Sequence, residues 1–399
     1  MWSNRYVRTV IISRVLLQLG IWIRNFAILL YVTDLTNNDP QYVSLISVAE
    51  FAPIFLFALI GGTFADKWRP KRTMVWCDLL SALSIILVLV VLAFGSWYAL
   101  LLGTLISASL SQFSQPSASK LFKQHVPAEQ LQGVMAIFQS LNAGFMVIGP
   151  IFGAFIYQQY GIEVSLILTG VMFLGSALVL SSLPRDVSAV NATGTGSFKQ
   201  DLMEGLRYMW ANRALRTVGT TFAAAGLGAG LIQPMFLFIA IENLGQDSQF
   251  LQWLLMVTGA AMFVGGGVIL SMANKIKPHI LLAIGLLSST ICTIGLGWST
   301  SIALTFALQI VNGFFTPCIH VGIQTMIMQN TEAAFIGRVG GTITPIFMGM
   351  MVVGMSTAGY LKAASSLFTV FTLSGILFLL GMLLLLPLFE KKRKSEISC

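Results

Sequence analysis

Long apolar runs cover almost the whole chain and leave little choice of fold. A helix needs about 20 consecutive, mostly apolar residues to span the hydrocarbon core of a bilayer. Twelve such runs lie near residues 9–33, 42–64, 73–95, 97–118, 133–158, 162–183, 215–241, 249–272, 279–299, 301–327, 337–360 and 365–388. Because 56% of the residues are apolar and only 10% are charged, one soluble core could not shield so much hydrocarbon surface. We therefore expect an all-α membrane protein with twelve transmembrane helices.

The basic residues indicate how these helices are oriented. With both termini on one side of the membrane, nearly all of the 23 Lys and Arg residues fall on that side, and Lys362 falls on the other. Since cytoplasmic loops carry the excess of Lys and Arg, we expect a multi-pass protein of the plasma membrane with both termini in the cytoplasm. The basic tail at 391–394 is expected to anchor this topology and to contact anionic lipid headgroups. This distribution argues against nucleic acid as the partner.

An internal repeat divides the chain into halves. NRYVRTV at 4–10 returns as NRALRTV at 212–218, and the same offset takes Gly20 to Gly228 and Asp34 to Glu242. Further along, a slightly smaller offset takes the glycine pair at 61–62 to the pair at 265–266. We therefore expect two pseudo-symmetric six-helix bundles in the same orientation, an arrangement typical of transporters. The expected domains are a first bundle at 1–183, a cytoplasmic linker at 184–212, and a second bundle with the basic tail at 213–399.

The linker has two parts of different character. Its first part is polar and rich in Gly, Ser and Thr, which is typical of a flexible connector. Its second part, FKQDLMEGLRYMWANR at 198–213, places apolar residues at helical spacing. That spacing predicts a short helix lying on the membrane surface.

Two motifs give the chain a resemblance to a known family. GGTFADKWRPKR at 61–72 is similar to the loop between helices 2 and 3 of the major facilitator superfamily, with Arg69 and Pro70 departing from the usual Gly-Arg. Gly144, followed by Gly149, Pro150 and Gly153 in the fifth span, resembles the motif of its drug–proton antiporter branch. The whole pattern is similar to macrolide-efflux and enterobactin-export proteins. The resemblance implies the major facilitator fold, with two bundles that rock around a central cavity.

The resemblance also implies roles for the two motifs. The loop motif would act as a conformational latch in which Asp66 meets the positive N-terminal end of a helix starting near Gly337 and favours the outward-facing state. The alternative is that the basic cluster only fixes the topology. The proposed latch consists of Gly62, Asp66, Lys67, Arg69, Lys71 and Arg72. In the fifth span, Gly149 and Pro150 could permit a gating bend or could serve only close helix packing, and the sequence leaves both open.

Polar residues concentrate on the helices that would line the cavity of such a fold. These are the first, fourth, seventh and tenth spans, as the resemblance implies. Their candidate cavity-lining residues are Arg14, Gln18, Asn25, Gln112, Gln115, Gln233, Gln309, Asn312 and His320. The twelfth span, in contrast, has the composition of a lipid-facing helix.

Two charged residues at membrane depth are candidates for proton coupling. Arg24 lies 16 residues beyond Arg8, and Glu50 lies 16 residues before Asp66, so both lie about 24 Å from the cytoplasmic edge. We expect Arg24 to hold Glu50 ionised, whereas burial would favour its protonation, so that substrate or tilting could switch the balance. A static buried ion pair and a placement at the lipid edge remain as alternatives.

Other charges have simpler interpretations. Asp34 and Glu242 would be solvated residues at equivalent helix ends or would form a cation-attracting mouth. Arg14 and Asp78 are expected to pair as structural charges. The isolated cysteines and the scattered histidines suggest neither a metal site nor a disulfide.

The sequence therefore predicts a monomeric secondary active exporter of small amphipathic, drug-like or macrolide-like molecules, with a role in antibiotic resistance. Proton antiport with alternating access would drive it, with the proton gradient as energy source and no cofactor. Its partners would be a small-molecule substrate, protons and membrane lipids. A siderophore, peptide or lipid exporter, a proton-coupled importer and a non-transporting sensor are the alternatives. An enzyme is not expected, because no nucleophile elbow, phosphate loop or metal-ligand cluster is present in the sequence.

Overall fold

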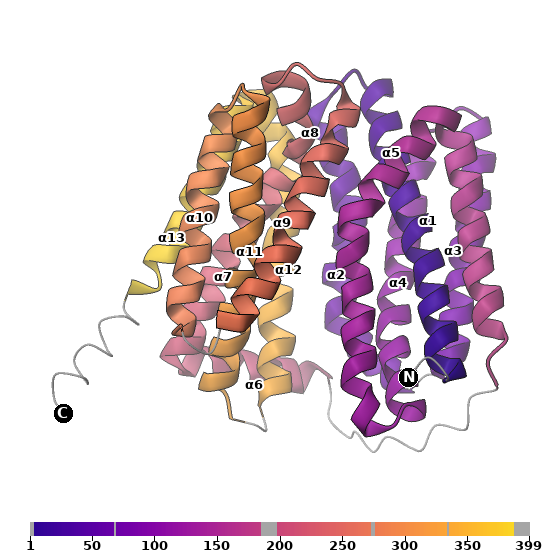
Figure 1. The fold of residues 1–399 in the computed structure, drawn as a ribbon, viewed down its shortest axis with the longest axis horizontal. Coiled ribbons are helices and arrows are strands. Elements are labelled where there is room, and N and C mark those ends of the chain that lie inside the picture. The colour runs from indigo at the N-terminus through magenta and orange to yellow at the C-terminus, as the bar shows by residue number, and fades with distance from the viewer. Residues whose placement is uncertain (1–3, 68, 185–197, 273–275, 333–334, 387–399) are drawn as a thin grey trace. The chain divides into compact units, whose positions relative to one another are not determined.

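The computed structural model describes residues 4–67, 69–184, 198–272, 276–332 and 335–386. Within these ranges, the backbone alone is described at 58–67, 128, 132, 198–202, 270 and 336–338. The described ranges are built from helices without strands (Figure 1). These are α1 (Arg5–Leu35), α2 (Pro40–Lys67), α3 (Pro70–Ala93), α4 (Tyr98–His125), α5 (Ala128–Ser181), α6 (Phe198–Ala211), α7 (Arg213–Ile232), η1 (Gln233–Met235), α8 (Phe236–Phe238), η2 (Ile239–Asn243), η3 (Ser248–Phe250), α9 (Leu251–Met272), α10 (Pro278–Trp298), α11 (Ile302–Asn330), α12 (Ile336–Ala364) and α13 (Leu367–Leu383).

Each of the twelve expected spans has a helical counterpart. In the described ranges, nine helices are long and apolar enough to cross a membrane, and α13 is a shorter apolar helix. The 54-residue α5 holds the fifth and sixth spans, which meet at Gly161 with φ 74° and ψ −173°. This backbone conformation is essentially restricted to glycine, so one residue turns the chain between two helices. The seventh span continues from α7 through η1, α8 and η2. The all-α membrane fold is therefore confirmed.

The chain divides into two compact units. The first comprises residues 1–38 and 49–195, and the second comprises residues 39–48 and 196–399. The segment 39–48, at the start of α2, thus groups with the second unit, whereas the sequence assigned all of 1–183 to the first. Most of the polar linker, at 185–197, lies outside the described residues. The predicted amphipathic segment is helical and forms α6.

Two asparagines at equivalent positions explain why both halves begin with the dipeptide Asn-Arg. Asn4 accepts a hydrogen bond from the Tyr6 amide and caps α1, while its Nδ2 donates to the His125 carbonyl at the end of α4 at 2.8 Å. Asn212 caps α7 in the same way, and its Nδ2 donates to the Asn330 carbonyl at the end of α11 at 3.1 Å. Each asparagine therefore satisfies orphan backbone groups at the start of one helix and at the end of another.

The repeat also holds deeper in each unit. Thr169 Oγ1 donates to the Gly20 carbonyl at 3.2 Å in the first unit, and Ser374 Oγ donates to the Gly228 carbonyl at 2.8 Å in the second. Both contacts join the first span of a half to its last span. The two-fold repetition expected from the sequence is thus present as matched hydrogen bonds.

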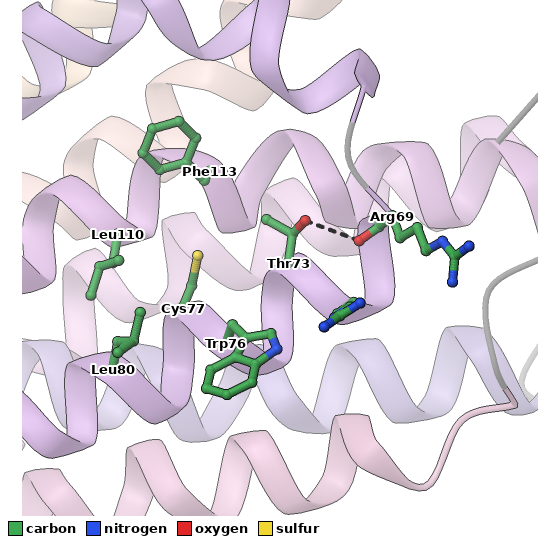
Figure 2. Close-up of a pocket in the computed structure, with 8 residues that line it drawn as sticks. Arg69, Thr73, Trp76, Cys77, Leu80, Leu110 and Phe113 are labelled. Atoms are coloured by element: carbon green, nitrogen blue, oxygen red, sulfur yellow. Dashed lines mark hydrogen bonds between the residues drawn. The ribbon is translucent and has the colours of Figure 1, made fainter. Parts of the chain in front are cut away.

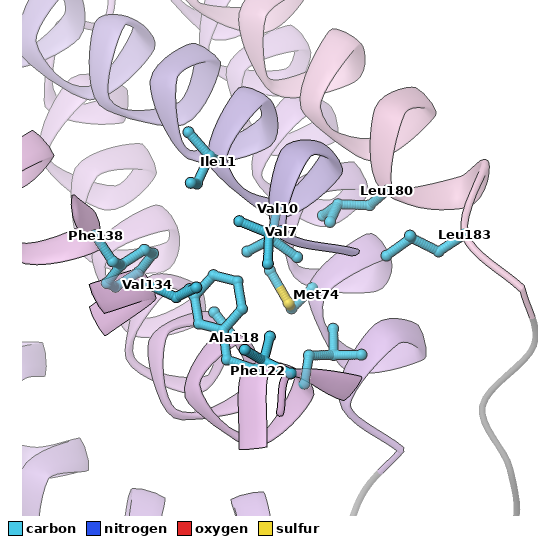
Figure 3. Packing of buried hydrophobic residues seen from close by; sticks show 12 residues of the cluster. Val7, Val10, Ile11, Met74, Ala118, Phe122, Val134, Phe138, Leu180 and Leu183 are labelled. Atoms are coloured by element: carbon cyan, nitrogen blue, oxygen red, sulfur yellow. The ribbon is translucent and has the colours of Figure 1, made fainter. Parts of the chain in front are cut away.

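A cluster of buried apolar side chains packs within the first unit. The members come from α1, α3, α4 and α5 and from the residues that directly follow α4 and α5, and Figure 3 shows ten of them, labelled, gathered in one place. They are Val7, Val10, Ile11, Met74, Ala118, Leu121, Phe122, Val126, Val134, Phe138, Leu180 and Leu183. Beside the cluster, Arg5 donates to the Ser182 carbonyl, and Lys71 donates to the Ser181 carbonyl at 2.9 Å and to the Leu183 carbonyl. These cations satisfy carbonyls at the C-terminal end of α5 and complement its dipole.

We expect Asn4→Ala and Asn212→Ala each to lower the free energy of unfolding by about 1 kcal/mol, because each removes a helix cap. The measurement is the thermal or denaturant unfolding of the purified protein in detergent. Ser356→Ala is the control, because that hydroxyl bonds only within its own helix, to the Val352 carbonyl. Equal stability of all three variants would contradict a structural role for the repeated asparagines.

Candidate functional site

A chain of three polar side chains lies between α1 and α2. Arg24 is 2% exposed, and its Nε and Nη2 donate to Asn25 Oδ1 at 3.0 and 2.8 Å. Asn25 Nδ2 in turn donates to Glu50 Oε1 at 2.6 Å. Arg24 Nη1 is buried without a hydrogen-bond partner. The arginine and the acid singled out by the sequence are therefore brought together, with Asn25 as the bridge.

The bridging role of Asn25 could not be read from the sequence, which placed this residue on the cavity-lining stripe. An amide can accept from a guanidinium and donate to a carboxylate at the same time, and Asn25 does both. The Asn25 amide thus links the guanidinium of Arg24 to the carboxylate of Glu50. Hydrogen bonds of this kind are stronger in a low-dielectric environment than in water. Any change in the charge of Glu50 acts directly on the Asn25 amide and through it on Arg24.

A second polar cluster lies between α1, α3 and α5. Asp78 is 2% exposed, and its Oδ2 accepts from Ser176 Oγ at 2.6 Å, while Ser176 and Ser13 are joined at 2.8 Å. Arg14 donates from Nε to Asn142 Oδ1 at 3.5 Å and lies over the Phe138 ring at 5.3 Å. The partners of the two charges are thus different groups: Asp78 binds a hydroxyl, and Arg14 binds an amide and an aromatic ring.

The proposed latch is only partly described. The side chains of Asp66 and Lys67 lie outside the described residues, as do those at 336–338, where α12 begins, and only the backbone of Gly62 is described. Arg69 and Arg72 are exposed at the start of α3. Lys71 instead points to the carbonyls at the end of α5 and so ties α3 to that helix.

The glycine motif of the fifth span contacts α1. A Cβ added at Gly149 would lie 2.4 Å from the Trp22 ring, and a Cβ at Gly153 would lie 2.6 Å from the Trp22 carbonyl oxygen. At Gly144 a Cβ would meet nothing within 4 Å. Pro150 is buried within α5. Of the two interpretations that the sequence left open, close packing is the one that these contacts support at Gly149 and Gly153.

The cavity-lining candidates differ in their surroundings. In the first unit, Gln18 donates to Asn142 Oδ1 at 2.8 Å, Gln112 bonds Ser111, and Gln115 is exposed. In the second unit, Gln233 and His320 are exposed, and Asn312 accepts from Ser289 at 3.2 Å.

Gln309 is the exception, because it is 0% exposed. Its Oε1 accepts from Thr258 at 3.0 Å, whereas its Nε2 has no hydrogen-bond partner. It packs between α11 and α9 and has no surface open to a cavity.

The acids at the ends of the first and seventh spans have partners that the sequence did not indicate. Glu242 forms an ion pair with Lys362 at 2.6 Å, and Lys362 Nζ lies 4.1 Å from the centre of the Phe238 ring. At the equivalent place in the first unit, the Tyr157 hydroxyl donates to Asp34 Oδ2 at 3.4 Å. Both acids thus bind a side chain from another helix of their own unit rather than standing alone in solvent.

The described ranges contain no group of three or more His, Cys, Asp or Glu side chains that could bind a metal ion. Cys77, Cys292 and Cys318 are buried and unpaired, and Cys399 lies outside the described residues.

Comparisons with known proteins agree with this architecture. Residues 10–241 and 218–398 match the family described as Major Facilitator Superfamily. Macrolide efflux protein A of Streptococcus pyogenes is 20% identical, covering 94% of this chain and 94% of its own. Multidrug efflux pump Tap of Mycolicibacterium fortuitum is 26% identical, covering 86% and 87%. A crystal structure of the nucleoside transporter NupG superposes with a TM-score of 0.74 at 13% identity, covering 97% of this chain and 99% of that one.

These matches confirm the resemblance that the two motifs indicated. Members of this family are transporters, so the expectation that the chain is not an enzyme is confirmed as well. With its many membrane-spanning helices and its paired bundles, the chain belongs to the Major Facilitator Superfamily and is a multi-pass membrane transporter.

Proposed function

We propose that this protein is a secondary active exporter of small amphipathic molecules and that proton antiport drives it. The observation that carries the proposal is the hydrogen-bonded relay from the buried Arg24 through the half-buried Asn25 to the half-buried Glu50. Ionisable groups at membrane depth are costly and most often serve transport. The efflux function in the names of the two curated relatives supports the direction of transport.

The relay offers a simple coupling step. With Glu50 ionised, its Oε1 accepts from Asn25, whose own oxygen is held by Arg24. A proton arriving at Glu50 removes the negative charge, weakens the Asn25 contact and frees the amide for another partner. Each proton moving inward under 100 mV releases about 2.3 kcal/mol, which sustains roughly a fifty-fold gradient of a neutral substrate.

The composition supports an amphipathic cargo. The chain holds 18 Met and 28 Phe residues, and Met-rich or aromatic surfaces can adapt to several ligands. Exposed polar side chains at Gln115, Gln233 and His320 supply hydrogen-bonding groups. We place the protein in the plasma membrane with both termini in the cytoplasm, working as a monomer without a cofactor.

The test is pH-driven transport of erythromycin and ethidium in proteoliposomes. We expect Glu50→Gln to lower the rate of proton-driven transport by about ten-fold or more, because an amide cannot exchange the proton, and to leave substrate binding nearly unchanged. Glu163→Gln is the matched control, since Glu163 is an exposed acid of the same bundle. Unchanged proton-driven transport by Glu50→Gln would contradict the coupling role.

Direction and substrate class are tested in intact cells. An exporter lowers the accumulation of these compounds until an uncoupler is added, whereas an importer raises it. Competition by a siderophore, a peptide or a lipid would redirect the proposal to an exporter of that class. Ligand binding without any movement across proteoliposomes would indicate a sensor.

A further inference from the structure

A groove of about 540 Å³ runs along α3 in the first unit, away from the relay of Arg24 and Glu50. Figure 2 shows Arg69 at one end of this groove and Leu80 and Leu110 at the other, with Trp76 between them. Its lining consists of Arg69, Arg72, Thr73, Trp76, Cys77, Leu80, Leu110 and Phe113. One face of α3 supplies five of these residues, its N-cap residue Arg69 is the sixth, and α4 supplies two, so the groove lies between two neighbouring helices. Its volume lies within the range of about 300–1,000 Å³ that is usual for small-molecule sites.

The side chains that line the groove change from charged to apolar along its length. Arg69 and Arg72 are exposed at its first end. Trp76 comes one turn further and is 51% exposed, and Leu80 follows at 41%. Phe113 lines the groove from α4, and its ring meets that of Phe57 from α2 edge to face at 5.1 Å. Along the groove, a cation is followed by an indole and then by aliphatic side chains. A phospholipid presents its phosphate, glycerol and acyl chain in the same order.

The dimensions agree with one leaflet. From Arg69 to Leu80 the helix rises about 16 Å at 1.5 Å per residue. Half of the hydrocarbon core measures about 15 Å. The tryptophan lies near the charged end, which is where indole rings concentrate at membrane interfaces.

We propose that this groove binds an anionic phospholipid from the leaflet on the arginine side, with the phosphate at Arg69 and Arg72 and one acyl chain along Trp76, Leu80 and Leu110. Guanidinium groups bind phosphate oxygens through paired hydrogen bonds. Arg69, the N-cap residue of the 24-residue α3, makes no capping hydrogen bond with its side chain, and the amide groups at a helix start favour an anion. The nearby Lys71 is engaged with the end of α5 and does not line the groove.

The proposal differs from ordinary lipid solvation of a membrane protein because it requires headgroup selectivity at one groove. Bulk lipid would cover Trp76 in proportion to its abundance. A phosphate-binding site would instead enrich the anionic species, and the enrichment would depend on the two arginines.

The test uses quenching of Trp76 fluorescence by brominated acyl chains. The full-length protein is reconstituted in phosphatidylcholine with about 10 mol% of either brominated phosphatidylglycerol or brominated phosphatidylcholine, and the Trp76 contribution is the difference between wild type and Trp76→Phe. We expect quenching by the brominated anionic lipid to exceed that by the brominated zwitterionic lipid by about three-fold or more. Equal quenching by both lipids would overturn the proposal.

Two variants separate the parts of the site. Arg69→Gln with Arg72→Gln should abolish the preference, whereas Arg213→Gln with Arg216→Gln should keep it, because those exposed arginines begin α7 instead. Leu110→Phe narrows the apolar end without adding a fluorescent indole and should lower quenching by both lipids while the arginines remain. Retained preference in the first double variant would overturn the assignment of the phosphate.

Soluble glycerol phosphate distinguishes a lipid from a free phosphate compound. Added in excess, it should leave the quenching by brominated phosphatidylglycerol unchanged, since the acyl chain contributes to binding. Displacement of the lipid by glycerol phosphate alone would overturn the commitment to a phospholipid.

Discussion

Gly153→Ala should destabilise the first unit by about 1–3 kcal/mol, the usual cost of forcing an extra methyl group into a closely packed contact. The added Cβ would lie 2.6 Å from the Trp22 carbonyl oxygen and 2.7 Å from Phe26 Cβ. A backbone carbonyl cannot rotate away as a flexible side chain can, so α1 and α5 must separate. The measurement is thermal unfolding of the purified protein in detergent, together with the yield of monodisperse protein.

Gly144→Ala is the matched control within the same helix. A Cβ there meets nothing within 4 Å, and alanine is a better helix former than glycine by up to about 1 kcal/mol. We therefore expect unchanged or slightly raised stability. If Gly153→Ala kept full stability but lost transport, gating rather than packing would be the role of this glycine.

Arg24→Leu should lower the free energy of unfolding by about 3–5 kcal/mol, which is typical when one partner of a buried charged network is removed. Asn25 Oδ1 loses the two hydrogen bonds that it accepts from Arg24, and Glu50 loses the cation that favours its ionised form. The double variant Arg24→Leu with Glu50→Leu removes both charges and should recover much of this loss. Denaturant unfolding of the wild type, both single variants and the double variant gives the coupling energy directly.

A stability control and the transport activity of the double variant decide whether the relay couples protons to transport. Arg69→Leu is the control, because Arg69 is exposed and its loss should change the stability by no more than about 0.5 kcal/mol. A stable double variant that still transports with a proton gradient would make the relay a static structural feature. A stable double variant without proton-driven transport would support coupling through Glu50.

The spans and the repeat could be predicted from the sequence because hydrophobic length and duplication are local properties of the chain. The break between the fifth and sixth spans was placed at 158–162, and the structure places it at Gly161. The helix at 198–211 was also expected from its apolar spacing. These features depend on neighbours along the chain and not on how the helices rotate against one another.

The partners of individual side chains could not be predicted, because they depend on that rotation. Asn25 was assigned to a cavity by its position on a helical stripe, yet it bridges Arg24 and Glu50. Lys362 was noted only for lying on the minority side of the membrane, and it pairs with Glu242. Trp76 and Leu80 could not be told from ordinary lipid-facing residues until α3 and α4 formed a groove around them.

The single-residue joint at Gly161 has a mechanical consequence. Because a single residue joins the two helical segments of α5, their joined ends cannot separate or slide independently of each other. A bend around Pro150 in the first segment would be passed on to the second segment as a tilt. The far end of that second segment is held by Arg5 and Lys71. A displacement in the middle of the first bundle would therefore also shift the end of the bundle where Arg5 and Lys71 bind.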